Sequence, residues 1–235
     1  MTLLHLASVP GRVEPGPEGF VHLSRPHQVH IPARELYGGR TDLQLLVVDE
    51  SRLQSEVRDE GGFPHLYGPL TEDAVVEVVP FAHDLFFVPT LPTEEPVARL
   101  IAETEAGYSE IYGEGSTALT PKLTMDELGP PTGTYLVGWR DGEPVAGGGL
   151  RLLEPRLGEI KRMYVVPASR SMGVARRLLW ALEEAARRRG LERIRLDTGP
   201  KQPHAQALYR SAGYREISSY NDNRRASFWG EKRLT

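Results

Sequence analysis

Residues 159–190 read EIKRMYVVPASRSMGVARRLLWALEEAARRRG and predict a strand, a loop and a helix in direct succession. The strand runs from Gly158 to Val166 and ends at Pro167. Beyond Ser171 the apolar side chains return every three or four residues, on one face of a helix that Gly190 ends. These apolar positions are Val174, Leu178, Leu179, Leu182, Ala185 and Ala186.

The loop between this strand and helix, Arg170 to Ala175, has the pattern Q/R-x-x-G-x-G/A. The first N–H groups of a helix have no partner within it and the dipole is positive there, so such a loop can hold a pyrophosphate. Gly173 and Ala175 are small enough to let a phosphate approach the backbone, and Arg170 can add charge-assisted hydrogen bonds. A glycine before a helix is also common without any ligand, so the surrounding chain decides between the two interpretations.

Further strands and helices are expected on both sides. Upstream, a strand at Asp84–Pro89 precedes an amphipathic helix from Pro92 to about Gly113, and Asp141-Gly142 forms the turn of a hairpin. The other expected elements are the hairpin strands Thr134–Trp139 and Pro144–Leu153, a strand at Arg193–Asp197, a helix at Pro203–Ser211, and strands at Tyr214–Ser218 and Ala226–Arg233.

Four segments of this region together resemble the GNAT superfamily of acyl-coenzyme A-dependent N-acyltransferases. They are Glu159–Pro167, Arg170–Ala175 with its helix, Leu196–Gly199 and Ala205–Tyr214, in the family's order and spacing. The resemblance covers residues 83–235. It implies a mixed, mostly antiparallel twisted sheet flanked by helices, an α+β or α/β class, with acetyl-CoA as acyl donor in a V-shaped gap between two splayed strands.

The same resemblance assigns residues to the donor. Its pantetheine arm is expected to pair with the backbone of Met163, Tyr164 and Val165. Its pyrophosphate is expected on Arg170, Ser171, Met172, Gly173, Val174 and Ala175. Gln202 stands where family members often carry an Asn beside the cofactor arm, and its amide, one methylene longer, is expected to substitute.

Acyl transfer to an amine needs a group that accepts a proton, an oxyanion donor and a proton for the departing thiolate. Glu159, at the start of the cofactor-binding strand, is the expected base, acting directly or through water; the alternative is an exposed carboxylate at a strand end. Tyr209 is the expected acid, since family members commonly place theirs there, and the alternative is packing of an amphipathic helix. An N–H of the Met163–Tyr164 segment is the expected oxyanion donor.

The acceptor is expected between two groups of side chains. Tyr220 and Asn221 lie where family members border the acceptor site. Tyr108 and Tyr112, on the helix that ends near Gly113, are the expected opposite wall. For these tyrosines, packing against the fold is the alternative interpretation.

Residues 1–82 form a separate small α+β domain in this interpretation. Four strands and one helix are expected, at Leu3–Ala7, Gly19–Leu23, Asp42–Val48 and Ala74–Val79, and at Pro26–Tyr37. The patterns GFVHLS at 19–24 and FPHLYGPL at 63–70 resemble a small, mostly bacterial family of uncharacterised domains, distantly similar to the ADP-ribosyltransferase fold.

That second resemblance makes a candidate site of His5, His22, Glu60, His65 and Tyr67, for a nicotinamide dinucleotide. The alternative is a set of hydrogen-bonded polar residues that hold a loop. The histidines lack a recognisable ligand spacing, so no metal is expected.

The net charge, the hydropathy and the cysteine content exclude several classes of function. A formal charge of −4 over 235 residues gives no argument for nucleic acid or an anionic membrane, and no stretch approaches the roughly 18 apolar residues of a membrane helix. The absence of cysteine excludes thiolate chemistry and fits the cytoplasm. The expected function is transfer of an acetyl group to a primary amine of a small molecule or peptide in a ternary complex. A non-catalytic acyl-CoA sensor and ADP-ribose or NAD chemistry in the first domain remain alternatives.

Overall fold

The computed structural model describes residues 2–113 and 123–234. The chain packs as two compact units. The N-terminal unit comprises residues 1–89 with 138–145, and the C-terminal unit comprises residues 90–137 with 146–235. A domain boundary between residues 82 and 83 stays a prediction.

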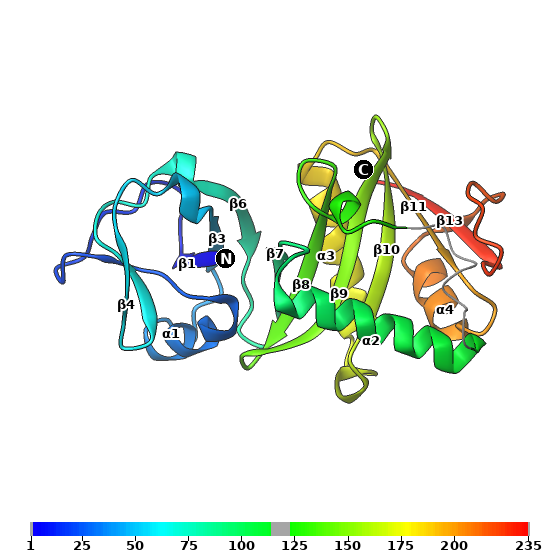
Figure 1. The fold of residues 1–235 in the computed structure, drawn as a ribbon, viewed down its shortest axis with the longest axis horizontal. Coiled ribbons are helices and arrows are strands. Elements are labelled where there is room, and N and C mark those ends of the chain that lie inside the picture. The colour runs from blue at the N-terminus through cyan, green and yellow to red at the C-terminus, as the bar shows by residue number, and fades with distance from the viewer. Residues whose placement is uncertain (1, 114–122, 235) are drawn as a thin grey trace. The chain divides into compact units, whose positions relative to one another are not determined.

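The N-terminal unit contains two small sheets and a short helix (Figure 1). One antiparallel sheet has the order β1-β3-β6, from Leu3–Ala7, Gln44–Val48 and Val75–Pro80. The other has the order β2-β5-β4, from Val21–His22, Phe63–Leu66 and Val57–Glu60. The helix α1 is His30–Glu35. Apolar side chains of both sheets, among them Leu23, Leu46 and Leu66, form one buried core.

Two details of this unit differ from the sequence prediction. The β4–β5 hairpin was not expected, because β4 is largely exposed and polar and so lacks an apolar alternation, while its turn uses Gly61 and Gly62 at φ +61° and +86°. The helix expected over Pro26–Tyr37 is limited to α1, preceded by a short 3-10 turn. Pro32 has no N–H to donate, so it fits only the first turn of a helix.

Seven strands form the large sheet, in the order β12-β13-β11-β10-β9-β8-β7 (Figure 1). In chain order they are β7 Phe86–Thr90, β8 Gly133–Arg140, β9 Glu143–Glu154, β10 Leu157–Val165, β11 Arg193–Thr198, β12 Arg215–Glu216 and β13 Phe228–Arg233. The strand β10 pairs antiparallel with β9 and parallel with β11, and β13 is antiparallel to β11 and β12. The mixed sheet confirms the expected fold class.

The described residues of the C-terminal unit also form three α-helices: α2 Glu95–Tyr112, α3 Val174–Arg188 and α4 Pro203–Ser211. α2 and α3 lie on opposite faces of the sheet (Figure 1). The apolar stripe of α3 is buried as expected, with Leu178 and Leu182 fully covered. Burying a leucine side chain contributes roughly 1.5–3 kcal/mol, so this face holds α3 on the sheet.

The centre of the sheet opens between β10 and β11. In the described part of the chain, their parallel pairing joins only Leu157–Glu159 to Arg193–Arg195. On its other edge β10 has an irregularity between Lys161 and Tyr164, where Arg162 has φ +55°. A bulge interrupts the ladder and bends the strand, so the residues after Glu159 leave a gap beside β11.

Candidate active site

The loop after β10 ends in a left-handed glycine at the start of α3. Gly173 has φ +77° and no other atom within 4 Å of the position a Cβ would take, so its peptide faces open space. Ser171 has φ +61°. The exposed Arg170 donates its Nε–H to the carbonyl of Val165 at 3.0 Å, which keeps the guanidinium beside the loop. Small residues, a helix N-terminus and a nearby cation are what pyrophosphate binding requires.

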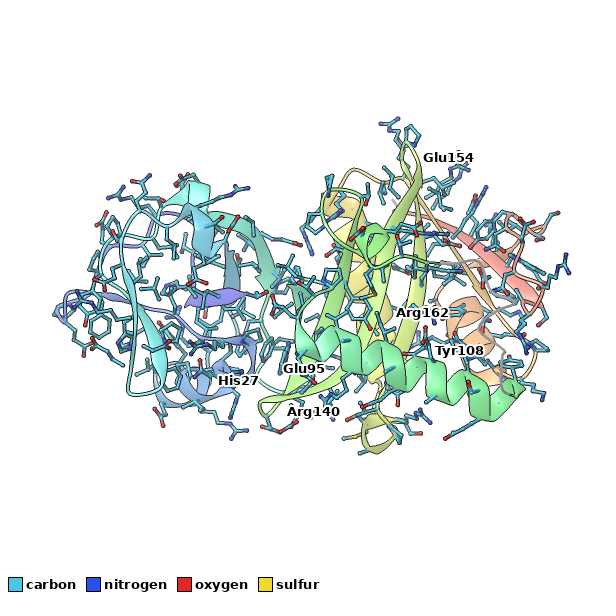
Figure 2. All side chains as sticks on the ribbon, in the orientation of Figure 1. His27, Glu95, Tyr108, Arg140, Glu154 and Arg162 are labelled. Carbon is cyan, nitrogen blue, oxygen red and sulfur yellow. The ribbon has the colours of Figure 1, made fainter. Side chains whose placement is uncertain are left out.

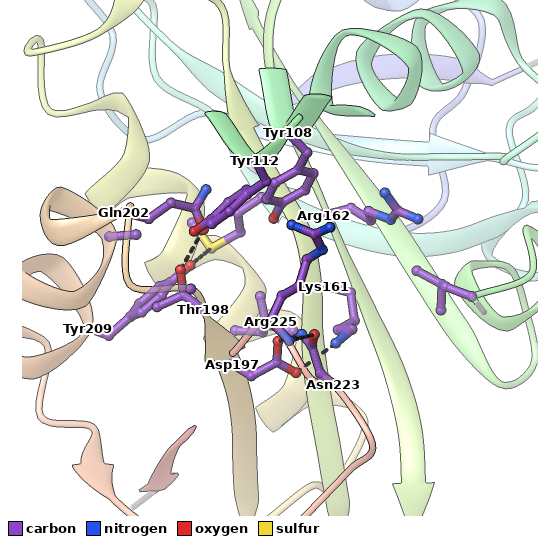
Figure 3. A pocket seen from close by; sticks show the side chains of 15 residues that line it. Tyr108, Tyr112, Lys161, Arg162, Asp197, Thr198, Gln202, Tyr209, Asn223 and Arg225 are labelled. Atoms are coloured by element: carbon purple, nitrogen blue, oxygen red, sulfur yellow. Dashed lines mark hydrogen bonds and ion pairs between the residues drawn. The ribbon is translucent and has the colours of Figure 1, made fainter. Parts of the chain in front are cut away.

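A pocket lies at the gap between β10 and β11 (Figure 3). Tyr108 and Tyr112 of α2 form one wall. Tyr108 and Arg162, which are labelled in Figure 2, come from α2 and β10. Met163 of β10 and Tyr209 of α4 form the end near α4. The pocket therefore joins the expected thioester position to the expected acceptor wall.

Tyr209 is buried, with 7% of its surface exposed, and its hydroxyl donates to Met163 Sδ at 3.8 Å. Burial raises the pKa of the phenol well above its ordinary value, because desolvation disfavours the phenolate. Tyr209 thus holds its proton at physiological pH, beside the segment expected to bind the donor.

Gln202 also lines the pocket, at the N-terminus of α4. Its Oε1 accepts a hydrogen bond from Thr198 Oγ1 at 2.7 Å, so its amide nitrogen is turned away from Thr198 (Figure 3). The side chain is also a hydrogen-bond partner of Tyr108, and its expected place beside the cofactor arm stays a prediction.

Glu159 is fully buried, so the alternative of an exposed strand-end carboxylate is wrong. Arg151 donates to Oε2 at 2.7 Å, Tyr220 donates to Oε1 at 2.7 Å, and Lys161 Nζ lies 3.4 Å from Oε1. Arg151 also pairs with Glu127. Glu159 is not among the residues that line the pocket, and its role as the base stays a prediction.

Asp197, at the end of β11, is the carboxylate that does line the pocket. It accepts hydrogen bonds from Lys161 at 2.8 Å, Asn221 at 2.7 Å and Asn223 at 2.6 Å. Lys161 bridges Asp197 to Glu159, so the two carboxylates belong to one network. Sequence reasoning did not select Asp197; the available signal was a charged residue at the end of a buried strand.

The structure places the expected acceptor residues in two positions. Tyr108 and Tyr112 line the pocket, and burial raises the pKa of both phenols. Tyr220 and Asn221 instead hydrogen-bond to Glu159 and do not line the pocket. Burial and the adjacent Glu159 carboxylate raise the pKa of Tyr220.

Arg225, from the segment before β13, enters the pocket beside Tyr112 and was not selected from the sequence (Figure 3). Its guanidinium carbon lies 5.6 Å from the centroid of the Tyr112 ring. Tyr164, Val165 and the residues of the Arg170–Ala175 loop do not line this pocket; they lie along β10 and at the start of α3.

The five candidate residues of the N-terminal unit are also brought together. His22 and His65 are opposite each other in the β2–β5 pair, with ring centroids 5.2 Å apart. His5 Nδ1 lies 2.8 Å from the carbonyl oxygen of His22, and Tyr67 donates to Glu60 at 3.0 Å. These contacts join members of the set to one another, and both a structural role and a role in nucleotide chemistry stay predictions.

Among residues 2–113 and 123–234, no group of three or more His, Asp or Glu side chains is arranged to hold a metal ion. The same residues contain no helix with the length and apolar character needed to span a bilayer.

Comparison with protein families gives two matches. Residues 98–214 match the acetyltransferase (GNAT) family, and residues 11–78 match a family of unknown function, DUF952. The chain is 36% identical to an IAA acetyltransferase of Azospirillum brasilense over 124 residues, covering 52% of this chain and 79% of the relative. It is 35% identical to the uncharacterized N-acetyltransferase YjgM of Escherichia coli, covering 54% and 80% of the two chains.

Solved structures show the same fold. A putative acyl-CoA N-acyltransferase from Klebsiella pneumoniae is 29% identical and superposes with a TM-score of 0.52, covering 64% of this chain and 98% of that one. The PaiA N-acetyltransferase of Thermoplasma acidophilum, solved in complex with coenzyme A, has a TM-score of 0.52 at 15% identity, covering 64% and 99%. At that identity the likeness concerns the fold alone.

Proposed function

The chain belongs to the GNAT acetyltransferase family. We propose that it moves an acetyl group from acetyl-CoA to a primary amine of a small molecule or peptide. The observation that carries the proposal is the pocket where the splayed strands β10 and β11 meet Tyr209. It supports direct transfer in a ternary complex, since its lining includes both Met163 of the expected donor segment and the Tyr108–Tyr112 wall.

The chain's residues fit acetyl-CoA in two places. The open, left-handed backbone at Gly173, with Arg170 beside it, fits a pyrophosphate. The edge of β10 from Met163 to Val165 lies beyond the pairing with β11, so its backbone groups, apart from the Val165 carbonyl that accepts from Arg170, can pair with an extended amide chain. When bound, acetyl-CoA supplies the acyl group as an activated thioester.

Residues of the chain can donate and accept the protons that move during the transfer. Tyr209 holds one at its hydroxyl, where a departing thiolate can take it. Asp197 lies at the pocket wall, where it can orient an ammonium group and accept its proton, with Glu159 behind it through Lys161. The bulge between Lys161 and Tyr164 leaves N–H groups of β10 outside the ladder, where they can stabilise an oxyanion.

The test is release of the thiol from acetyl-CoA, followed with a thiol reagent against amino acids, polyamines, aminoglycosides and peptide N-termini. The protein contains no cysteine, so it adds no background. We expect turnover with one class of amine. Binding of coenzyme A by calorimetry without turnover on any amine would contradict catalysis and favour the acyl-CoA sensor.

A further inference from the structure

The charges of the pocket are unequal. Among the described residues, three cations line it, Lys161, Arg162 and Arg225, and one carboxylate, that of Asp197. Lys161 pairs with Asp197 at 2.8 Å. Arg162 pairs with Glu105 of α2 at 3.2 Å, outside the lining. Two of the three cations therefore have a carboxylate partner within the chain.

Arg225 differs from the other two. Its Nε is buried and makes no hydrogen bond within the described chain, and no carboxylate of that part of the chain forms an ion pair with it. Its guanidinium carbon lies 5.6 Å from the centroid of the Tyr112 ring. A guanidinium that is partly removed from water without a carboxylate has lost solvation that an anionic ligand can restore.

The position of Arg225 is fixed relative to Asp197. Its backbone N–H donates to Asn223 Oδ1 at 3.1 Å, and Asn223 Nδ2 donates to Asp197 Oδ1 at 2.6 Å. Hydrogen bonds through Asn223 thus connect the Asp197 carboxylate to the backbone of Arg225. The guanidinium of Arg225 lines the same pocket and has no carboxylate partner in the described part of the chain (Figure 3). An amine and an acid group on one small molecule match this pair.

Arg225 lies on the acceptor side of the pocket. The donor path proposed above runs from the Arg170–Ala175 loop along Val165 and Met163 to Tyr209. Lys161 and Asp197 come after Met163 on that path, toward the pairing of β10 with β11, and Arg225 lies beside Tyr112 of the expected acceptor wall. A group bound by Arg225 therefore belongs to the acceptor.

We propose that the acceptor is an amine that also carries a carboxylate, an amino acid or a related amino-carboxylate, and that Arg225 binds this carboxylate while Asp197 faces the amine. The proposal rests on the proposed function. In the reaction the acceptor ammonium first releases one proton to solvent, and the neutral amine then forms the N–C bond as the C–S bond breaks. The nitrogen gives its second proton toward Asp197 and the thiolate takes one from Tyr209, while the carboxylate is unchanged. Three cations in the lining disfavour polyamines, whose charges they repel.

The test compares amino acids with their primary amides, which differ only in the charged group, in the wild type and in Arg225→Gln. The matched control is Arg224→Gln, which removes an exposed arginine from the neighbouring position. We expect Arg225→Gln to lower kcat/KM for the acid about 10- to 100-fold, mainly through KM, as loss of a charge-assisted pair does. The amide should change less than about threefold, and Arg224→Gln should change neither.

The outcomes separate this proposal from the proposed function. An equal loss for acid and amide in Arg225→Gln would overturn it, since Arg225 would then only shape the pocket. Turnover of polyamines or peptide amines but not amino acids would also overturn it and leave the acetyltransferase intact. If no amine releases thiol, the proposed function fails, and calorimetry on the coenzyme A-saturated protein then tests the carboxylate site by itself. Tighter binding of the amino acid than of its amide, lost in Arg225→Gln, supports the site. Equal binding of the two, or no binding, overturns it.

Discussion

Tyr209 and Glu159 are both buried, but of the two only Tyr209 lines the pocket. Tyr209 is buried but lines the pocket, so its proton stays bound and within reach of a ligand. Glu159 is buried behind the wall, with Arg151, Lys161 and Tyr220 around its oxygens. Breaking a buried ion pair by removing one partner costs about 3–5 kcal/mol. Loss of activity on changing Glu159 would therefore mix lost stability with lost chemistry, whereas Tyr209 offers a cleaner test.

Replacing Tyr209 by Phe keeps the ring and removes only the proton donor. We expect kcat for acetylation to fall about 100-fold, the lower range of general acid catalysis, with the Kd for acetyl-CoA nearly unchanged. Because burial raises the pKa of Tyr209 above its ordinary value of 10.0, the acid form persists and the wild-type rate should not decline up to about pH 9 through this group. Steady-state kinetics and calorimetry measure both quantities.

Tyr214→Phe is the matched control, because Tyr214 is equally buried, its ring centroid is 5.9 Å from that of Tyr209, and it does not line the pocket. It should retain the wild-type rate. Equal rates for wild type and Tyr209→Phe would remove the assigned role of Tyr209.

The helix α3 is flanked by two glycines in the left-handed conformation, and their surroundings are similar. Gly173 at its N-terminus has φ +77° and Gly190 beyond its C-terminus has φ +72°, and neither has an atom within 4 Å of the place where a Cβ would stand. An alanine at either costs about 1–2 kcal/mol of backbone strain and no packing. The two positions therefore differ in their relation to the proposed pyrophosphate and not in folding cost.

We expect Gly173→Ala to weaken coenzyme A binding about tenfold or more, because a methyl group would stand in front of the helix N–H groups. Gly190→Ala should lower the unfolding temperature by about as much as Gly173→Ala does, but it should leave the Kd for coenzyme A unchanged. Calorimetry with coenzyme A and thermal unfolding of both variants measure this. Equal affinities in the two variants would place the pyrophosphate elsewhere.

The sequence predicted elements where the side chains have a clear period. The α3 stripe and the β8–β9 hairpin at Asp141-Gly142 are visible in the apolar pattern, and both are confirmed. The β4–β5 hairpin is not visible, because its exposed strand is as polar as a loop. Arg225 and Asp197 are 28 positions apart, and only the return of β13 beside β11 brings them to one pocket. Such pairs depend on tertiary contacts that no local pattern records.

The histidines of the chain are unevenly divided between the two units. Six of the seven lie in the N-terminal unit, His5, His22, His27, His30, His65 and His83, and only His204 lies in the other. Burial lowers the pKa of His5 below 6.5, and burial together with Arg25 and His30 lowers that of His27. Both histidines whose pKa is lowered therefore lie in the N-terminal unit.

We expect the N-terminal unit to lose stability selectively as the pH falls below about 6.5. The unfolded chain binds the His5 proton more readily than the folded one, so the stability is fully present above pH 6.5 and declines below it, by at most about 1.4 kcal/mol per pH unit for one proton. Protection factors from hydrogen exchange at about pH 7.5 and about pH 5.5 measure this unit by unit. His5→Asn keeps a donor for the His22 carbonyl, but does not titrate, so it should reduce the decline; His204→Asn, at an exposed position, should not. An equal loss of protection in the two units would show that acid acts through the carboxylates that both contain and not through the histidines.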